Sequence, residues 1–165
     1  MGLMKLPEFE TMKEAKEYLR ENWKRGVKCP CCGQHVKLYK YKMDASKALG
    51  LICAYKLDKR YNGESFHLTR DFSTILKKNA NALHYTKMQY YGFITPDTSK
   101  DDPSKKGSGW WFVNQKARDF VEGRLKVPSV FYVYDGKCIG FGEEKIDIRE
   151  ALAEKFDYEE LMAEF

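Results

Sequence analysis

Three of the five cysteines in this chain lie close together, at Cys29, Cys31 and Cys32, and they are the residues with the clearest capacity for chemistry. A C-x-x-C turn can direct two thiolates toward one tetrahedral metal centre, and a following glycine lets backbone amides approach the sulfur atoms. Cys29 and Cys32 have this spacing, and Gly33 follows them. The pattern predicts a structural zinc ion that holds together a hairpin too small to have its own core.

The run from Cys29 to Gly33, Cys-Pro-Cys-Cys-Gly, resembles the zinc knuckle of zinc ribbons and related modules. The resemblance is incomplete, because a structural zinc site needs four ligands and the chain has no second C-x-x-C. We expect Cys138 and His35 to complete the site, or two copies of the chain to pool their knuckles around one metal. A metal-free turn and a redox-active thiol pair are the alternatives. The other candidate ligands are Cys53, which falls on an apolar helix face and suits the core, His67 and His84.

Catalytic motifs are missing from the sequence. The histidines are scattered, and none belongs to an H-E-x-x-H helix, a nucleophile elbow or a P-loop. The one glycine-rich run, Lys106–Gly109, precedes an expected strand, so it would not place a helix N-terminus at a phosphate. We therefore expect a protein that is not an enzyme.

Charge is distributed unevenly along the chain, although the net charge is only +5. Residues 24–60 hold ten Lys and Arg against two Asp, whereas residues 143–165 hold nine acidic residues against three basic ones. A basic segment of this kind is typical of a surface that meets phosphate groups. The alternative is an ordinary solvated surface.

Sequence features also bear on cellular location. No run approaches the roughly 18 apolar residues of a transmembrane helix, and the N-terminal residues lack the apolar region of a signal peptide. The odd number of cysteines argues against a secreted disulfide framework. We expect a cytoplasmic protein without a membrane partner.

Apolar spacing predicts the order of the elements. A first helix begins at Glu10 or Thr11, a hairpin carries the cysteines, and a second helix over Ala45–Tyr61 is capped by Asp44. Asp135-Gly136 predicts a tight hairpin between strands at 130–134 and 137–141. The expected parts are 1–43 with the N-terminal helix and cysteine hairpin, 44–123 with the main domain, and 124–165 with the C-terminal hairpin and acidic helices packed on it.

The stretch Asn81–Val121 has the most informative order of elements. It predicts a helix between the N-cap Asn81 and the stop Gly92, then two strands joined by a polar loop that ends at Gly109, then another helix. We expect that loop, which begins at Pro96, to be mobile rather than regular. Together with the residues from Asp44 to Gly123, this order resembles the winged-helix variant of the helix-turn-helix. The resemblance implies an α+β fold with a winged-helix core, in which the helix before Gly92 recognises DNA and the loop is the wing.

Side-chain types within that stretch indicate which residues would contact DNA. Spacing places Tyr85 or His84 with Met88 and Tyr91 on the inward side of the helix. Asn, Gln and Lys can hydrogen-bond base edges in a major groove, and lysines can contact phosphate. Trp110 and Trp111 are expected to pack. The candidate nucleic-acid-binding residues are Asn81, His84, Lys87 and Gln89 for bases and Lys77, Lys78, Lys105 and Lys106 for phosphate.

The leading hypothesis is a small winged-helix protein that binds double-stranded DNA, alone or as a homodimer. A transcriptional regulator of the type found in phages and mobile elements would fit. The alternative is an interaction module that binds and inhibits a host defence complex, because the wing has mixed charge and the C-terminus is acidic. A third reading is an RNA binder that uses the strand Lys37–Lys42, where lysine and tyrosine alternate. The same lysines could instead protect a strand edge from pairing.

Overall fold

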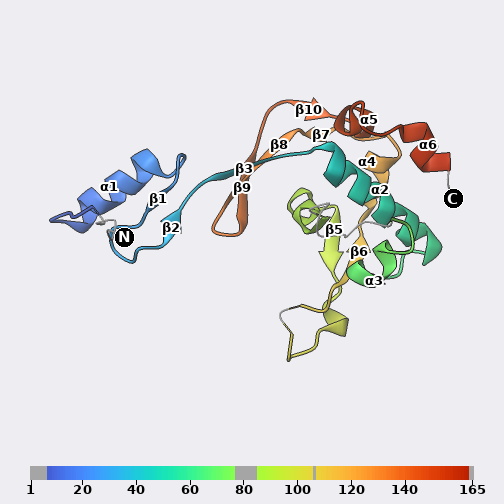
Figure 1. Ribbon diagram of the computed structural model, residues 1–165, viewed down its shortest axis with the longest axis horizontal. Helices are drawn as coiled ribbons and strands as arrows, with labels where there is room; N and C mark the ends of the chain where they lie inside the picture. The colour runs from blue at the N-terminus through green and yellow to red at the C-terminus, as the bar shows by residue number, and fades with distance from the viewer. Residues whose placement is uncertain (1–6, 77–84, 106, 164–165) are drawn as a thin grey trace, which may run out of the picture. The chain divides into compact units, whose positions relative to one another are not determined.

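The structure is a computed structural model that describes residues 7–76, 85–105 and 107–163. It is an α+β protein of several helices and small antiparallel sheets (Figure 1). The chain forms two compact units. Unit 1 is Met1–Tyr41 with Phe131–Gly140, and unit 2 is Lys42–Val130 with Phe141–Phe165.

This division differs from the predicted parts 1–43, 44–123 and 124–165. The expected C-terminal hairpin forms, as β8 (Val130–Tyr134) and β9 (Lys137–Phe141). Its strand β8 pairs with β3 (Tyr39–Lys42), so the sheet order is β3-β8-β9. The pairing joins residues about 90 positions apart, which local sequence patterns do not report.

Unit 1 begins with helix α1 (Met12–Asn22), whose start is set by a capping box between Thr11 and Glu14. The cysteine hairpin follows as β1 (Val27–Lys28) and β2 (His35–Val36), which pair antiparallel. Between β8 and β9 the turn residues Asp135 and Gly136 both have positive φ, at 49° and 71°. That geometry is the type I′ turn that matches strand twist.

Unit 2 is built around α2 (Ala45–Arg60), which is buried along nearly its whole length. Asp44 caps it by accepting the Lys47 N–H at 3.0 Å. A helix that is buried on all sides belongs at the centre of a domain, and elements from the whole unit pack on it. They are α3 (Leu68–Phe72), the 3₁₀ helix η2 (Tyr85–Tyr91), β6 (Trp110–Val113), α4 (Gln115–Val121) and α5 (Ile148–Leu152).

Two small sheets and a last helix complete unit 2. The order β4-β6-β5 joins β4 (Phe66–His67) and β5 (Ile94–Pro96) to opposite edges of β6. Its register pairs His67 with Trp110, and Pro96 with Trp111. The second sheet pairs β7 (Val127–Pro128) with β10 (Lys145–Ile146). Helix α6 (Tyr158–Ala163) packs next to α5.

Stacked aromatic side chains fill the core of unit 2. Phe66 and Phe72 stack with ring centres 6.1 Å apart, and Tyr85 meets Phe72 edge-on at 5.0 Å. Phe93 stacks on both Tyr91 and Phe120, with ring centres 5.2 Å apart in each pair. Offset and edge-on contacts of this kind stabilise beyond area burial.

One buried ion pair ties α2 to α4. Asp58 is 3% exposed, and its two carboxylate oxygens each accept a hydrogen bond from Arg118 at 2.8 Å. This bidentate geometry suits a buried carboxylate, because both oxygens are satisfied by one planar group. The same carboxylate raises the pKa of the Arg118 guanidinium.

Helix α3 differs from its prediction. The apolar residues Phe72, Ile75 and Leu76 predict a helix over residues 71–79, whereas α3 spans Leu68–Phe72. Residues 77–79 lie outside the described residues. The earlier start has a local cause: Asp71 accepts the His67 N–H at 2.7 Å, and the His67 ring accepts the Arg70 N–H at 3.3 Å. Such side-chain bonds to the backbone fix a helix start.

Within the part of the chain that the structure describes, no helix has both the length and the apolar character to cross a membrane.

Candidate nucleic-acid interface and cysteine knuckle

The described part of the predicted recognition helix is the 3₁₀ helix η2, not an α-helix. A 3₁₀ helix has three residues per turn, so residues three apart lie in one row. Tyr85, Met88 and Tyr91 have that spacing, and all three are buried. This inward set agrees with the prediction. Four of the seven residues in this stretch are Tyr or Thr, types that favour the α-helix weakly.

The other two rows of η2 face outward. Gln89 is exposed, and Lys87 lies with its amine 5.9 Å from the centre of the Tyr90 ring. These are the predicted base-reading residues that the structure describes. Lys105, in the wing, is also exposed and lies 4.0 Å from Asp102. The remaining predicted contacts lie outside the described residues; they are Lys77, Lys78, Asn81, His84 and Lys106.

The predicted wing begins with an ordered turn around the buried Asp97. Its carboxylate accepts hydrogen bonds at 2.5 Å from the hydroxyls of Ser65 and Ser99, and its N–H donates to the Trp110 carbonyl at 2.9 Å. The short 3₁₀ helix η3 (Thr98–Lys100) follows. The sequence favoured a loop without regular structure here. The turn is ordered because the buried Asp97 carboxylate is bonded to Ser65 and Ser99. The hydrogen bond from Ser65, followed by that from Ser99, lowers the pKa of Asp97 below its usual value.

Trp110 lies at the base of this wing and is close to two cationic side chains. The Lys100 amine is 3.7 Å from the centre of a Trp110 ring, and the Arg70 guanidinium carbon is 5.0 Å from it. The His67 ring meets Trp110 edge-on at 5.6 Å. Cations within about 6 Å of an indole face are attracted by its quadrupole. We call His67, Arg70, Lys100 and Trp110 the wing-base cluster.

Both tryptophans pack, as expected from the sequence. Trp111 contacts the buried Tyr85 edge-on at 6.2 Å, on the core side of β6. Trp110 contacts the wing-base cations on the opposite side of the strand. Gly109 precedes it with φ +74°, and a Cβ there would lie 3.0 Å from the His67 ring. Only glycine accommodates this approach.

A buried carboxylate lies next to each of the two cations Arg70 and Lys100. Asp71 has a side chain 3% exposed and accepts two hydrogen bonds from Arg70, whose side chain is 62% exposed. Burial raises the Asp71 pKa, but the bonds from Arg70 and from the His67 N–H outweigh it, and the net pKa is lowered. Lys100 is 40% exposed, and it lies 3.8 Å from Asp97, which is 7% exposed. The acidic groups therefore point inward and the basic groups outward.

Sequence reasoning did not select His67 for this cluster and did not select Arg70 at all. The signal that would have found them is the pairing of β4 with β6, which sets His67 opposite Trp110. That pairing joins residues more than 40 positions apart and has no local signature.

The cysteine turn has the hydrogen bonds from backbone amides to sulfur that are expected of a knuckle. The Cys29 thiol accepts the backbone N–H of Cys32 and then that of Cys31, and these bonds lower the Cys29 pKa. The Cys29 carbonyl accepts the Gly33 N–H at 2.8 Å, which closes the turn. An electron-rich sulfur held by amides is the local geometry that a metal-binding or reactive thiolate needs.

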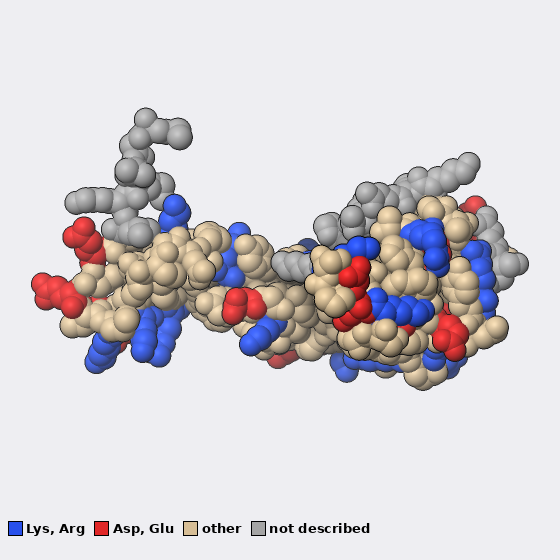
Figure 2. Space-filling view, turned by 90° about the horizontal axis from the view of Figure 1, so that it is seen from below, with Lys and Arg blue, Asp and Glu red and all other residues tan. Residues whose placement is uncertain are grey.

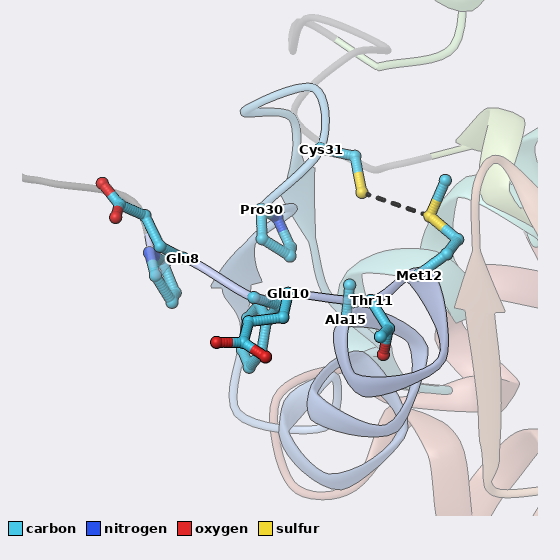
Figure 3. Close-up of a pocket in the computed structure, with 9 residues that line it drawn as sticks. Glu8, Glu10, Thr11, Met12, Ala15, Pro30 and Cys31 are labelled. Carbon is cyan, nitrogen blue, oxygen red and sulfur yellow. Dashed lines mark hydrogen bonds between the residues drawn. The ribbon is translucent and has the colours of Figure 1, made fainter.

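Cys31 points to a different place. Its thiol lies 3.7 Å from the Met12 sulfur, in a pocket of about 470 Å³ at the start of α1 (Figure 3). The carboxylates of Glu8 and Glu10 stand at the rim of this pocket. Burial and the neighbouring Cys29 raise the Cys31 pKa, so the two thiols differ in character.

The four predicted zinc ligands are not assembled. Among the described residues, no group of three or more His, Cys, Asp or Glu side chains could hold a metal ion. His35 is stacked instead against Gly26, where a Cβ would lie 3.1 Å from the ring. Cys138 donates its thiol hydrogen to the Gly140 carbonyl at 3.6 Å. Cys29 and Cys32 fit half of a zinc site, and zinc shared between two copies stays a prediction.

Comparison of the chain with protein-family models gave no match, and comparisons with curated proteins and with solved structures gave none either.

Proposed function

We propose that unit 2 binds double-stranded DNA, with the outward rows of η2 and the wing-base cluster as the contact surface. The observation that carries the proposal is that the basic side chains of that cluster are more exposed than their acidic partners. The side chains of Arg70 and Lys100 are 62% and 40% exposed, whereas those of their carboxylate partners Asp71 and Asp97 are only 3% and 7% exposed. Phosphate contacts depend on cations that the ligand can reach.

The order of elements supports the same function. A buried helix, a short strand, a second helix, the 3₁₀ helix η2 and a β-hairpin follow one another, and the first strand pairs with the last. This is an arrangement in which an outward helix and a wing can contact one duplex. The process that we propose for it is regulation of transcription.

The proposed contact surface rests on a few cations, because the charge around them is mixed. On the face shown in Figure 2, Lys and Arg lie interspersed with Asp and Glu, without a continuous basic area. Association with DNA is then driven by a few placed cations. The expected affinity for random duplex is modest and depends on salt.

Fluorescence anisotropy with a labelled random duplex at low salt tests the proposal. Lys87→Ala and Lys100→Ala are expected to weaken binding, whereas Lys155→Ala, an exposed lysine of the acidic C-terminal segment, is the matched control and is expected to bind as the wild type does. Absence of duplex binding by the wild-type protein, or equal losses in all three variants, would contradict the proposed surface.

A further inference from the structure

Unit 1 contains an open groove that the duplex-binding surface does not use. Its volume is about 470 Å³. The C-terminal end of α1 contributes Trp23 and Lys24, and the sheet contributes residues of β3, β8 and β9. The lining residues are Trp23, Lys24, Leu38, Lys40, Tyr132, Ile139 and Gly140.

Strand alternation explains why lysine and aromatic side chains meet there. In β3, Tyr39 and Tyr41 stack on each other, and Tyr41 stacks on the buried Phe131, so this set covers one face of the sheet. Lys40 lies between them and lines the groove on the other face. Tyr132 follows Phe131 and faces the groove for the same reason.

Trp23 is held at the edge of the groove by one contact of its ring and one of its backbone carbonyl. Its ring meets Tyr134 edge-on, with centres 5.4 Å apart, and its carbonyl accepts the Leu38 N–H at 3.0 Å. It is the C-cap of α1, so the next residue, Lys24, leaves the helix beside the groove. An aromatic side chain and an amine are thus placed together by one helix end.

The chemistry of the lining is selective. Trp23 and Tyr132 offer ring surfaces, Leu38 and Ile139 are apolar, and Ile139 is 50% exposed. Two lysines supply positive charge, and none of the described lining residues carries a carboxylate. Neither Lys24 nor Lys40 forms an ion pair with a described residue. The groove complements a ligand that combines flat apolar groups with negative charge.

We propose that this groove binds single-stranded DNA. One or two unpaired bases stack on Trp23 and Tyr132, and the adjacent phosphates contact Lys24 and Lys40. Aromatic platforms beside a basic groove bind single strands in this way without reading sequence. The choice of DNA over RNA rests on the proposed function of unit 2, whereas the stacking surface and the charge are independent of it.

Gly140 provides a variant that blocks the groove without removing any contact. A Cβ at this position would meet no atom within 4 Å, and its φ is not in the left-handed region. Gly140→Val therefore adds volume inside the groove, and a β-branched residue suits a strand. Lys24, Lys40 and both rings stay in place in this variant.

Anisotropy with a labelled oligo(dT) of about ten nucleotides tests the proposal in the full chain. We expect Gly140→Val to weaken binding roughly five- to 150-fold, the range associated with stacking of a base. Combining Lys24→Ala with Lys40→Ala is expected to lower the slope of log affinity against log salt by about 1.4. The matched control is Lys13→Ala with Lys16→Ala, which removes two exposed lysines of α1 outside the groove.

Each outcome decides the inference. Loss of oligo(dT) binding in the groove variants, with control and random-duplex binding unchanged, supports it. No oligo(dT) binding at low salt, or binding unaffected by Gly140→Val in a protein whose thermal melt is normal, overturns it. Preference for oligo(rU), or equal binding of polyglutamate, overturns the assignment to DNA. Because random duplex is measured in the same variants, failure of the groove and failure of the unit 2 surface give different results.

Discussion

The Lys100 amine lies 3.7 Å from the centre of a Trp110 ring while its charge partner, Asp97, is buried beneath it. Arg70, which lies 5.0 Å from the centre of a Trp110 ring, has a buried charge partner as well, Asp71. Asp71 holds Arg70 through two hydrogen bonds, and the Lys100 amine donates to the Ser65 hydroxyl at 2.9 Å beside Asp97. This arrangement orders a long side chain before any ligand arrives, which lowers the entropy cost of binding.

Acidification is expected to destabilise the wing base. The pKa of Asp97 is lowered from 3.8 by the bonds from Ser65 and Ser99. A carboxyl with a lowered folded-state pKa stabilises the fold above its unfolded pKa, and that contribution is lost as pH falls through the folded value. Thermal melts should therefore show a fall in midpoint below about pH 4 that is smaller in Asp97→Asn. An equal acid dependence in wild type and variant would contradict the role of Asp97.

Breaking the buried ion pair is expected to cost more than breaking an exposed one. Arg118→Met leaves the Asp58 carboxylate buried without its charge partner, and the free energy of unfolding should fall by about 3 kcal/mol. The control is Arg124→Ala, whose partners are Asp119 and Glu122 at the surface, and it should cost less than about 1 kcal/mol. Urea denaturation measures both values, and similar losses would argue against the special position of Asp58.

The thiols are expected to differ in reactivity. Hydrogen bonds from the backbone amides of Cys32 and Cys31 lower the pKa of Cys29, whereas burial raises the pKa of Cys53 to about 12. The thiolate is the reactive form, so iodoacetamide at neutral pH should modify Cys29 well before Cys53 in the native protein. Peptide mass spectrometry reads the order directly. Early modification of Cys53 would mean that α2 opens readily or is packed differently.

Zinc, if bound, is expected to be shared. One copy supplies Cys29 and Cys32, which is half of a tetrahedral site. Elemental analysis together with light scattering should then show about one zinc per two chains in a dimer. The Cys29→Ser variant should lose both the zinc and the dimeric state. One zinc per monomer would contradict sharing, and zinc-free monomers would show that the turn is stable through its hydrogen bonds alone.

Local sequence signals located most elements of the fold. Asp44 caps α2 as predicted, Asp135-Gly136 forms the predicted turn, and the strands beside the wing pair as expected. These features depend on a few neighbouring residues, so they can be read from a single sequence. The buried row Tyr85, Met88 and Tyr91 was also predictable, although its three-residue spacing fits the 3₁₀ geometry better than the α-helix that was expected.

The parts that could not be predicted depend on distant pairing. Sheet order β3-β8-β9 assigns the C-terminal hairpin to unit 1, and β4-β6 pairing brings His67 and Arg70 to Trp110. Neither contact leaves a periodic trace in the sequence. The zinc prediction rested on spacing around Cys29, which describes the turn well but does not place Cys138 or His35 beside it.

Salt dependence of duplex binding tests the central claim most directly. The slope of log affinity against log salt counts phosphate contacts at about 0.9 each. We predict a clearly negative slope for wild-type protein, reduced by about 1.8 in the Lys87→Ala and Lys100→Ala double variant and unchanged in Lys155→Ala. A wild-type slope near zero, or a slope that the double variant leaves unchanged, would contradict the assignment of duplex DNA to unit 2.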